Sequence, residues 1–525
     1  MIPIRRKYLG IALAAAGLIV ALLFGIAAYA LRSGALKPRV TSALADALNC
    51  DVSLDTLDVQ LVPVIKVTGT KLSIRLRGRP GLPPFVYAER FTLNLGLLSV
   101  LRRHIETIHL DGLQLNVPPR WADSLALAAD NSAAASPLAP APSLVGRALY
   151  GVDHVVAQDA RLNFVGKMKN NRPLDFAIHD LRMENATIDR PVQFRSRITN
   201  PIPEGIVEST GTFGPWNRDD PTETPMAGNF DLPIADLSTI NGIGGTTSAR
   251  GTFRGVLNDI HVAGTSETPD FSLDLGGKPV PLTTTFMITV DGTSGTTRLD
   301  RVDATLIGTP MLVTGTFTNL PGPHNNDVTL AVAIDKGRVE DLLRLAIDSA
   351  QPVLTGNISL NARVLLPPGA TSVRNRLSAS GTFGLGGGRF NDTEMQRQLQ
   401  ELSRRGQGKD ADEVVSRVAT NFSGQFSLGD GVLTLPACTF TVPGANISLS
   451  GRYTMGTEAV HFTGTMRLQA SLSDAVGGFK SIFIKPFNSL FRKNGSGAVL
   501  PIEITGTRSQ PKFDVKVKQA IKKES

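Results

Sequence analysis

Most of the chain alternates between apolar and polar positions with a period of two. In the run Val460–Leu472 every second position is apolar or glycine, and the positions between them are polar. Strict alternation of this kind predicts β-strands with one apolar and one hydrated face, which is the habit of antiparallel sheets. The residues that we expect on the apolar face of two such strands are Val328, Leu330, Val332 and Ile334, and Val460, Phe462, Met466 and Leu468.

Turn dipeptides and a loose Ser/Thr-Gly repeat punctuate these strands. Asp291-Gly292 and Asp430-Gly431 predict tight turns between neighbouring strands. A Ser/Thr-Gly pair, which we predict to open strands, recurs along the chain at irregular spacing. The irregular spacing excludes a fixed-period solenoid. Because glycine inside a sheet favours bends, the repeat predicts a sheet that is built from similar hairpins and is able to curl. Examples are Thr210-Gly211, Thr314-Gly315, Ser380-Gly381, Ser423-Gly424, Ser450-Gly451 and Thr463-Gly464.

Helices are few, so the fold class is predicted to be mainly β. Apolar residues at helical spacing predict a helix over Lys37–Asn49 and another over Gly337–Gln351. Asn391–Arg405 and Lys409–Thr420 read as a helical pair whose polar content suggests a solvated cap. The Ala/Pro/Ser-rich stretch 129–143 is predicted to be a linker.

The N-terminus carries the strongest indication of a cellular location. Arg5-Arg6-Lys7 precede 24 uncharged residues, Tyr8 to Leu31, which would span roughly 36 Å as a helix and so cross a bilayer core. The competing interpretation is a cleaved signal peptide ending near Ala28-Tyr29-Ala30, although the apolar run is longer than such peptides have. The basic residues place the N-terminus in the cytoplasm. We therefore expect a single-pass inner-membrane anchor, with the rest of the chain in the periplasm.

Catalytic and metal-binding motifs are not found in the sequence. The 7 His are scattered, and the 2 Cys, Cys50 and Cys438, lie too far apart in sequence for a Cys-based zinc motif. No metalloprotease, serine-hydrolase or phosphate-loop signature occurs. We therefore predict no enzymatic activity, no cofactor and no metal, and we leave open whether the two cysteines pair. The net charge of +8 with 6% aromatic residues does not favour a nucleic-acid partner.

One segment near the C-terminus combines regularly spaced aromatic residues with basic charge. A basic, aromatic amphipathic segment is typical of membrane interfaces, and the alternative is a lid packed over the end of the β-core. Pro486 would kink such a helix. The candidate residues for membrane or lid contact are Phe479, Phe483, Phe487, Phe491, Lys480 and Lys485.

The predicted helices are too sparse to cover the apolar face of so much sheet. An apolar face must be buried against something, and two solutions are open. The sheet closes on itself around a dry core, or it forms a trough whose apolar inner face is available to an apolar ligand. For a chain anchored in a membrane, the nearest such ligand is the acyl chains of phospholipid.

Strand motifs follow one another in a characteristic order near both ends of the chain. Near the N-terminus, Phe91–Leu98 is followed by Ile105–Val117, which contains the Ile-His-Leu-Asp-Gly strand. Near the C-terminus, the motifs are Ser423–Leu435, Ser450-Gly-Arg-Tyr453 and Leu500–Phe513. Each motif is common by itself. Their order, together with the single apolar N-terminal run, resembles the AsmA family of bacterial envelope proteins over about residues 1–120 and 380–525.

The resemblance implies an elongated, curled antiparallel β-groove that is anchored in the inner membrane, projects into the periplasm and has a few capping helices. It also implies a role in phospholipid movement and outer-membrane assembly, with phospholipid, the inner membrane, and outer-membrane or envelope proteins as partners. The alternative function is a scaffold or chaperone for outer-membrane proteins with a dry β-core. The predicted segments are a cytoplasmic tip and transmembrane anchor (1–32), an N-terminal AsmA-like β region (33–128), the linker (129–143), a middle β-groove (144–390) and a C-terminal AsmA-like region with a helical cap (391–525).

Overall fold

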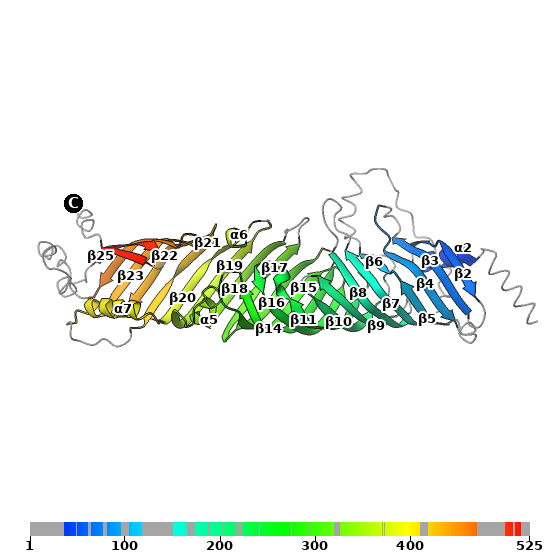
Figure 1. Cartoon of the computed structure of the whole chain (residues 1–525), viewed down its shortest axis with the longest axis horizontal. Helices are drawn as coiled ribbons and strands as arrows, with labels where there is room; N and C mark the ends of the chain where they lie inside the picture. The colour runs from blue at the N-terminus through cyan, green and yellow to red at the C-terminus, as the bar shows by residue number, and fades with distance from the viewer. Residues whose placement is uncertain are drawn as a thin grey trace, which may run out of the picture. The chain divides into compact units, whose positions relative to one another are not determined.

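The fold is mainly β, as the alternation predicted. The structure is a computed structural model, and its described residues contain 26 strands and few helices (Figure 1). It describes residues 36–48, 50–60, 65–76, 81–95, 104–117, 151–164, 174–186, 190–201, 203–215, 217, 223–240, 242–274, 276–292, 294–319, 326–369, 371, 373–409, 418–469, 499–507 and 510–515.

The chain divides into two compact units, which are treated separately. Unit 1 comprises residues 1–232, 251–261 and 291–294, and unit 2 comprises residues 233–250, 262–290 and 295–525. The strands that lie wholly in unit 1 are β1 (Cys50–Ser53), β2 (Thr56–Gln60), β3 (Ile65–Leu76), β4 (Val86–Leu95), β5 (His104–Asp111), β6 (Gln114–Val117), β7 (Gly151–Phe164), β8 (Leu174–Ala186), β9 (Val192–Pro201) and β10 (Glu204–Phe213).

Unit 1 is an antiparallel sheet with one parallel step. Strands β5 and β6 both pair with β7 in the parallel sense, and the other recorded pairs in this unit are antiparallel. Its core is rich in small residues, because Ala88, Ala157 and Ala160 are buried together with Leu113 and Ile178. The predicted first helix is confirmed as α2 (Leu36–Leu48), which packs on β1.

The stretch from residue 226 to residue 291 contributes some of its residues to unit 1 and the others to unit 2. Its elements are β11 (Met226–Asp236), the 3-10 helix η2 (Leu237–Thr239), β12 (Ile243–Gly244), β13 (Thr246–Val256), β14 (Asp259–Leu273) and β15 (Val280–Asp291).

The remainder of unit 2 is an antiparallel meander in which each strand pairs with the next along the chain. Its strands are β16 (Thr296–Leu306), β17 (Thr309–Asn319), β18 (Asn326–Arg338), β19 (Leu354–Leu366), β20 (Ser378–Phe390), β21 (Thr420–Gly429), β22 (Val432–Val442), β23 (Ala445–Thr454), β24 (Ala459–Leu468), β25 (Val499–Thr507) and β26 (Gln510–Val515). Its helices are α5 (Val339–Leu343), α6 (Val373–Arg376) and α7 (Thr393–Gly406).

The Ser/Thr-Gly pairs mostly lie within strands rather than opening them, which corrects the prediction. The register places a phenylalanine of the neighbouring strand opposite many of these glycines. A Cβ added at Gly451, for example, would lie 2.5 Å from Cδ1 of Phe462. Glycine is therefore required where an aromatic ring lies over the adjacent backbone. The ring lies this close at two of these glycines, Gly69 beneath Phe91 and Gly451 beneath Phe462. Gly211, Gly381 and Gly424 are also paired with phenylalanines, but an added Cβ there would first meet atoms of the strand on the other side.

Two predicted helices end differently in the structure. Helix α5 covers only Val339–Leu343, whereas the sequence predicted Gly337–Gln351, because Gly337 still pairs with Ile358 as part of β18. In the predicted Lys409–Thr420 helix, Thr420 instead begins β21, where its hydroxyl donates a hydrogen bond of 3.2 Å to the carbonyl of Gly388. Residues 410–417 lie outside the described part of the chain.

Candidate functional site

Apolar side chains of unit 2 line up in rows that run across the strands. Ile358 of β19 pairs with Leu385 of β20, which pairs with Phe422 of β21. Directly opposite residues of neighbouring strands project from the same face of a sheet. The register therefore carries one uninterrupted apolar row over seven strands, through Ile358, Leu385, Phe422, Phe440, Ile447, Met466 and Leu500.

Parallel rows contain the other residues that the sequence placed on the apolar face. Ile334 pairs with Leu360, and Leu360 pairs with Phe383. Val332 lies between Val313 and Ala362 in the next row. The remaining members pair as Val328 with Phe317 and Leu366, Leu330 with Gly315 and Val364, Val460 with Tyr453, and Phe462 with Gly451 and Ile504.

Most side chains in these rows are neither buried nor fully exposed. On β24, the outward positions are exposed and the inward ones are partly exposed, until Leu468 is buried. Of the eight residues predicted for the apolar face, Ile334 and Leu468 are buried, at 1% and 6% exposure. The other six are partly exposed: Val328, Leu330, Val332, Val460, Phe462 and Met466. A dry protein core would bury nearly all such residues, so this face is incompletely covered.

Phenylalanines form a cluster in the middle of the face. The ring of Phe422 meets Phe383 edge-on with centroids 4.9 Å apart, and its centroid is 6.2 Å from that of Phe440. Edge-to-face contacts at these distances hold aromatic rings in defined orientations. Sequence reasoning did not find this cluster, because three different strands bring its members together.

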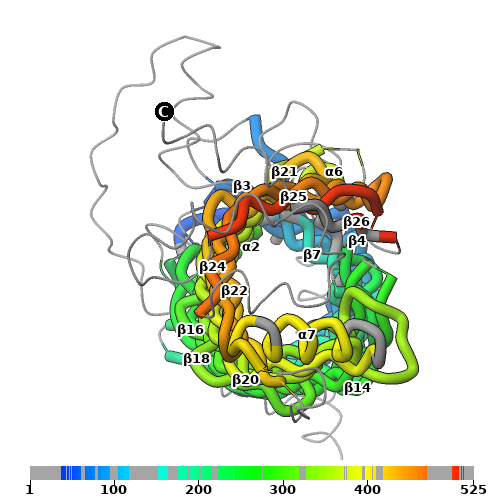
Figure 2. The backbone as a smooth tube through the Cα atoms, turned by 90° about the vertical axis from the view of Figure 1, so that its left-hand side faces the viewer, coloured from blue at the N-terminus to red at the C-terminus, as the bar shows by residue number. Residues whose placement is uncertain are grey.

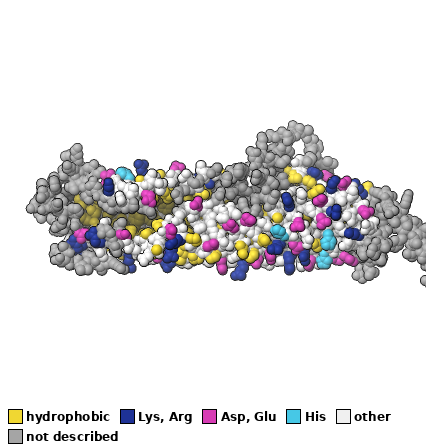
Figure 3. Space-filling model, in the orientation of Figure 1, with side chains coloured by type: hydrophobic (Ala, Val, Ile, Leu, Met, Phe, Trp, Pro, Cys, Tyr) yellow, Lys and Arg dark blue, Asp and Glu magenta, His cyan; other side chains and the backbone are white. Residues whose placement is uncertain are grey.

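Helix α7 covers one end of the apolar rows. Leu399 of α7 is buried against Ala445, Leu468 and Leu500, and Leu402 and Met466 pack on the same cluster. In Figure 2, α7 lies on the inner side of the bend that β20–β26 follow, so the apolar face is the concave one. Figure 3 shows a hollow with a hydrophobic surface over β20–β25. The sequence predicted the helix but not this contact, although Leu399 and Leu402, three residues apart, would have indicated an apolar face.

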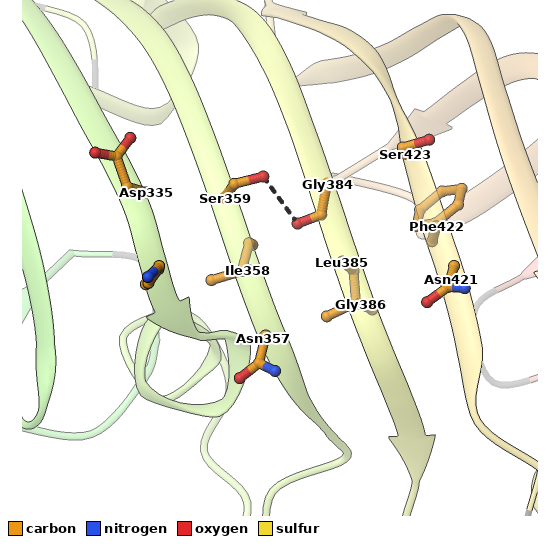
Figure 4. A pocket seen from close by; sticks show the side chains of 11 residues that line it. Asp335, Asn357, Ile358, Ser359, Gly384, Leu385, Gly386, Asn421, Phe422 and Ser423 are labelled. Atoms are coloured by element: carbon orange, nitrogen blue, oxygen red, sulfur yellow. Dashed lines mark hydrogen bonds between the residues drawn. The ribbon is translucent and has the colours of Figure 1, made fainter.

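A hollow of about 530 Å³ lies along β18–β21, and its lining combines polar residues with members of the apolar row (Figure 4). Because Gly384 and Gly386 have no side chains, the backbone of β20 is uncovered between the polar residues of β19 and β21. The Ser359 hydroxyl donates a bond of 3.4 Å to the carbonyl of Gly384, and the Asn421 side-chain oxygen accepts one of 3.1 Å from the N–H of Gly387. The lining is completed by Asp335, Lys336, Asn357, Ile358, Leu385, Phe422 and Ser423.

The one deeply buried carboxylate that the structure describes has a structural explanation. Asp341 is 1% exposed, and its carboxylate accepts bonds from Arg338 Nη2 at 2.7 Å and from the Thr309 hydroxyl at 2.9 Å. The hydrogen bond to Asp341 and the negative charge of that carboxylate raise the pKa of the Arg338 guanidinium. These bonds fix α5 to the turn between β16 and β17.

The two cysteines are free and buried, so they do not form a disulfide in this structure. Burial raises the pKa of the Cys438 thiol, while a backbone hydrogen bond with Leu449 opposes that rise. A raised pKa disfavours the reactive thiolate. Within the described ranges, no group of three or more His, Cys, Asp or Glu residues is placed to hold a metal ion.

Several predicted sites lie outside the described residues. They are the membrane anchor Tyr8–Leu31 and the candidate contact residues Phe479, Phe483, Phe487, Phe491, Lys480 and Lys485. Among the helices that are described, none is long and apolar enough to cross a membrane.

Comparison with known proteins gives no further assignment. No protein-family model, no curated protein and no solved structure matches the chain.

Proposed function

We propose that the apolar concave face of unit 2 binds the acyl chains of phospholipid. The observation that carries this proposal is the set of continuous apolar rows from β16 to β25, whose side chains are mostly only partly covered by the protein. Large apolar surfaces of this kind usually mark a binding surface for an apolar partner. The chemistry of the face fits hydrocarbon, since the rows consist of Val, Ile, Leu, Phe, Met, Ala and Gly with few polar interruptions.

The dimensions of the face fit lipid chains. Four inward positions along one strand, such as Val328 to Ile334, extend over about 20 Å, and ten strands at about 4.8 Å each extend over roughly 45 Å. An acyl chain lying along a row would displace water from both surfaces, with a gain of about 0.8 kcal/mol for each CH₂ that becomes fully buried. Because the rows are chemically uniform, a lipid can move along them without a dedicated site, and its head group remains at the hydrated rim.

The wider role rests on the resemblance to the AsmA family and on the N-terminal sequence. In this proposal, Tyr8–Leu31 anchors the chain in the inner membrane, and the remainder forms an elongated, curled β-groove in the periplasm. The groove conducts or shelters phospholipid that supports outer-membrane and envelope assembly. The segment with Phe483 and Phe487 would contact a membrane surface or close the groove as a lid. Catalysis and cofactors have no part in this mechanism.

A second candidate function is a scaffold or chaperone for outer-membrane protein assembly. The observation that favours it is the presence of two buried clusters: Ala88 with Ala157 and Ile178 in unit 1, and Leu399 with Leu468 in unit 2. These clusters are what a dry core requires. They involve only part of each sheet, whereas the partly exposed rows of unit 2 extend beyond them.

Photocrosslinking from strand β24 tests the proposed function. A photoreactive amino acid in place of Phe462 faces the concave side, and one in place of Thr463 faces outward on the same strand. Because neighbouring residues of a strand point to opposite faces, we expect phospholipid adducts at position 462 and only background at 463, measured by mass spectrometry of the intact full-length protein. Equal yields at both positions, or none at either, would favour the dry-core scaffold.

A further inference from the structure

Helix α7 occupies a surface that is chemically continuous with the exposed part of the apolar face. The row that begins at the partly exposed Phe422 continues through Phe440 and Ile447 to Met466 and Leu500. No polar residue interrupts this row where it passes beneath the helix. What changes along the row is its cover, because at this end the apolar residues of α7 lie over the row.

The apolar contact of α7 rests on two leucines. Leu399 is 7% exposed and belongs to the buried cluster, and Leu402 packs against it. Each leucine presents a branched hydrocarbon group to the sheet, which is the same chemistry as an acyl chain. Helix α7 and a lipid would therefore compete for one surface with similar contacts.

A few polar contacts complete the docking of α7. The Ser403 hydroxyl donates a bond of 2.7 Å to the Pro443 carbonyl, and the Gln407 amide donates a longer one of 3.5 Å to the same carbonyl. The Gln396 amide nitrogen donates to the Val418 carbonyl at 3.2 Å. Its side-chain oxygen, however, is buried with no hydrogen-bond partner among the described residues. An unsatisfied buried acceptor weakens the docked state.

The ion pair between Arg404 and Glu401 adds little to this docking. Its two nitrogen–oxygen contacts, at 2.7 and 3.0 Å, join residues of the same helix. The pair stabilises the helical conformation itself, whether the helix is docked or not. Helix α7 can therefore leave the sheet without breaking this ion pair.

We propose that the surface beneath α7 is a terminal lipid-binding subsite, which α7 occupies in place of an acyl chain when no lipid is bound there. This inference rests on the proposed function of the concave face. Lipid on the open part of the rows reaches this end by displacing Leu399 and Leu402, and the helix returns when the lipid leaves. The subsite takes the hydrocarbon of a phospholipid, because the described residues that form this surface, among them Met466, Leu468 and Leu500, are apolar.

Labelling at two positions of β24 tests the subsite in the full-length protein. Phe462 lies on the open part of the face, and Met466 packs against the cluster beneath α7. Photoreactive amino acids at these positions are compared after incubation with mixed phosphatidylethanolamine–phosphatidylglycerol vesicles. We expect strong lipid labelling at 462 and labelling at least about fivefold weaker at 466, because occupation by α7 reduces the fraction of chains that are competent to bind.

Loosening the helix should expose the subsite. Leu399→Ser removes the main apolar contact, and the milder Ser403→Ala removes the bond to Pro443 while retaining the leucines. Either variant is expected to raise labelling at 466 severalfold, toward that at 462. Gln398→Ser, at an exposed position of the same helix, is the matched control and should change neither yield. Circular dichroism of each variant confirms that the strands remain folded.

Three outcomes would overturn the inference. Labelling at 466 that is as strong as at 462 in the protein with an unaltered α7 would show that α7 does not occupy the subsite. Labelling at 462 with none at 466 in both loosened variants would show that the covered surface is permanent core. No labelling at 462 in any protein would instead overturn the proposed function, and the subsite with it.

Discussion

Replacing Val332 with aspartate is expected to abolish lipid binding by unit 2 while the fold is retained. Val332 is partly exposed on the concave face, between Val313 and Ala362. With lipid in place, the new carboxylate would be covered by acyl chains, and burying an unpaired charge in hydrocarbon costs several kcal/mol. Since each 1.4 kcal/mol is a factor of ten, the lipid content of the purified protein should fall at least tenfold. Without lipid, the carboxylate is hydrated and the strand remains intact.

Ala331→Asp is the matched control for this variant. Ala331 is exposed on the outward face of the same strand, one residue away. The same charge at this position should leave both lipid content and the circular dichroism spectrum unchanged. Unfolding of Val332→Asp with a stable Ala331→Asp would mean that the concave face is a dry core. Equal lipid content in both variants would mean that the lipid is bound elsewhere.

Asp341→Ala should produce the largest loss of stability in unit 2. The change leaves the Arg338 guanidinium, the Thr309 hydroxyl and the N–H of Gly308 without their shared carboxylate partner. Removing one member of a buried ionic network costs 3–5 kcal/mol when both partners are buried. Half of the Arg338 side chain is solvent-exposed, so we expect a decrease of about 2–4 kcal/mol in the free energy of unfolding.

Urea titration followed by circular dichroism measures this effect, with Asp303→Ala as the control. Asp303 also pairs with an arginine, Arg301, at 2.7 Å, but both side chains are about half exposed. Exposed ion pairs contribute little to stability, so the control should unfold at the same urea concentration as the original chain. Similar midpoints for the two variants would show that the Asp341 network does not hold α5 in place.

The sequence was sufficient to predict a mainly β fold and, for the strands over 328–334 and 460–468, which residues share a face. The period of two determines which residues of one strand share a face, and Val328 to Ile334 and Val460 to Leu468 share faces in the structure as predicted. The length of α5 was predicted wrongly for a local reason. Gly337 and Arg338 continue the pairing of β18 with β19, and long-range pairing overrides helical periodicity there.

The arrangement of the strands relative to one another could not be read from the alternation. Period two contains no information about register, so the apolar row from Ile358 to Leu500 and the contact of Phe383 with Phe422 emerge only when the strands are paired. The parallel pairing of β5 with β7 was likewise not predicted. The Ser/Thr-Gly repeat was recognised, but its meaning depends on the neighbouring strand that supplies a ring, as Phe462 does for Gly451.

The central claim is that the concave face of unit 2 carries phospholipid, and the lipid content of the purified full-length protein tests it most directly. The protein and its Val332→Asp variant are purified in parallel from the membrane fraction, extracted with organic solvent and analysed by quantitative mass spectrometry. The account predicts stoichiometric phospholipid in the original protein and a large reduction in the folded variant. An original protein that is folded and contains no more phospholipid than the variant would contradict it.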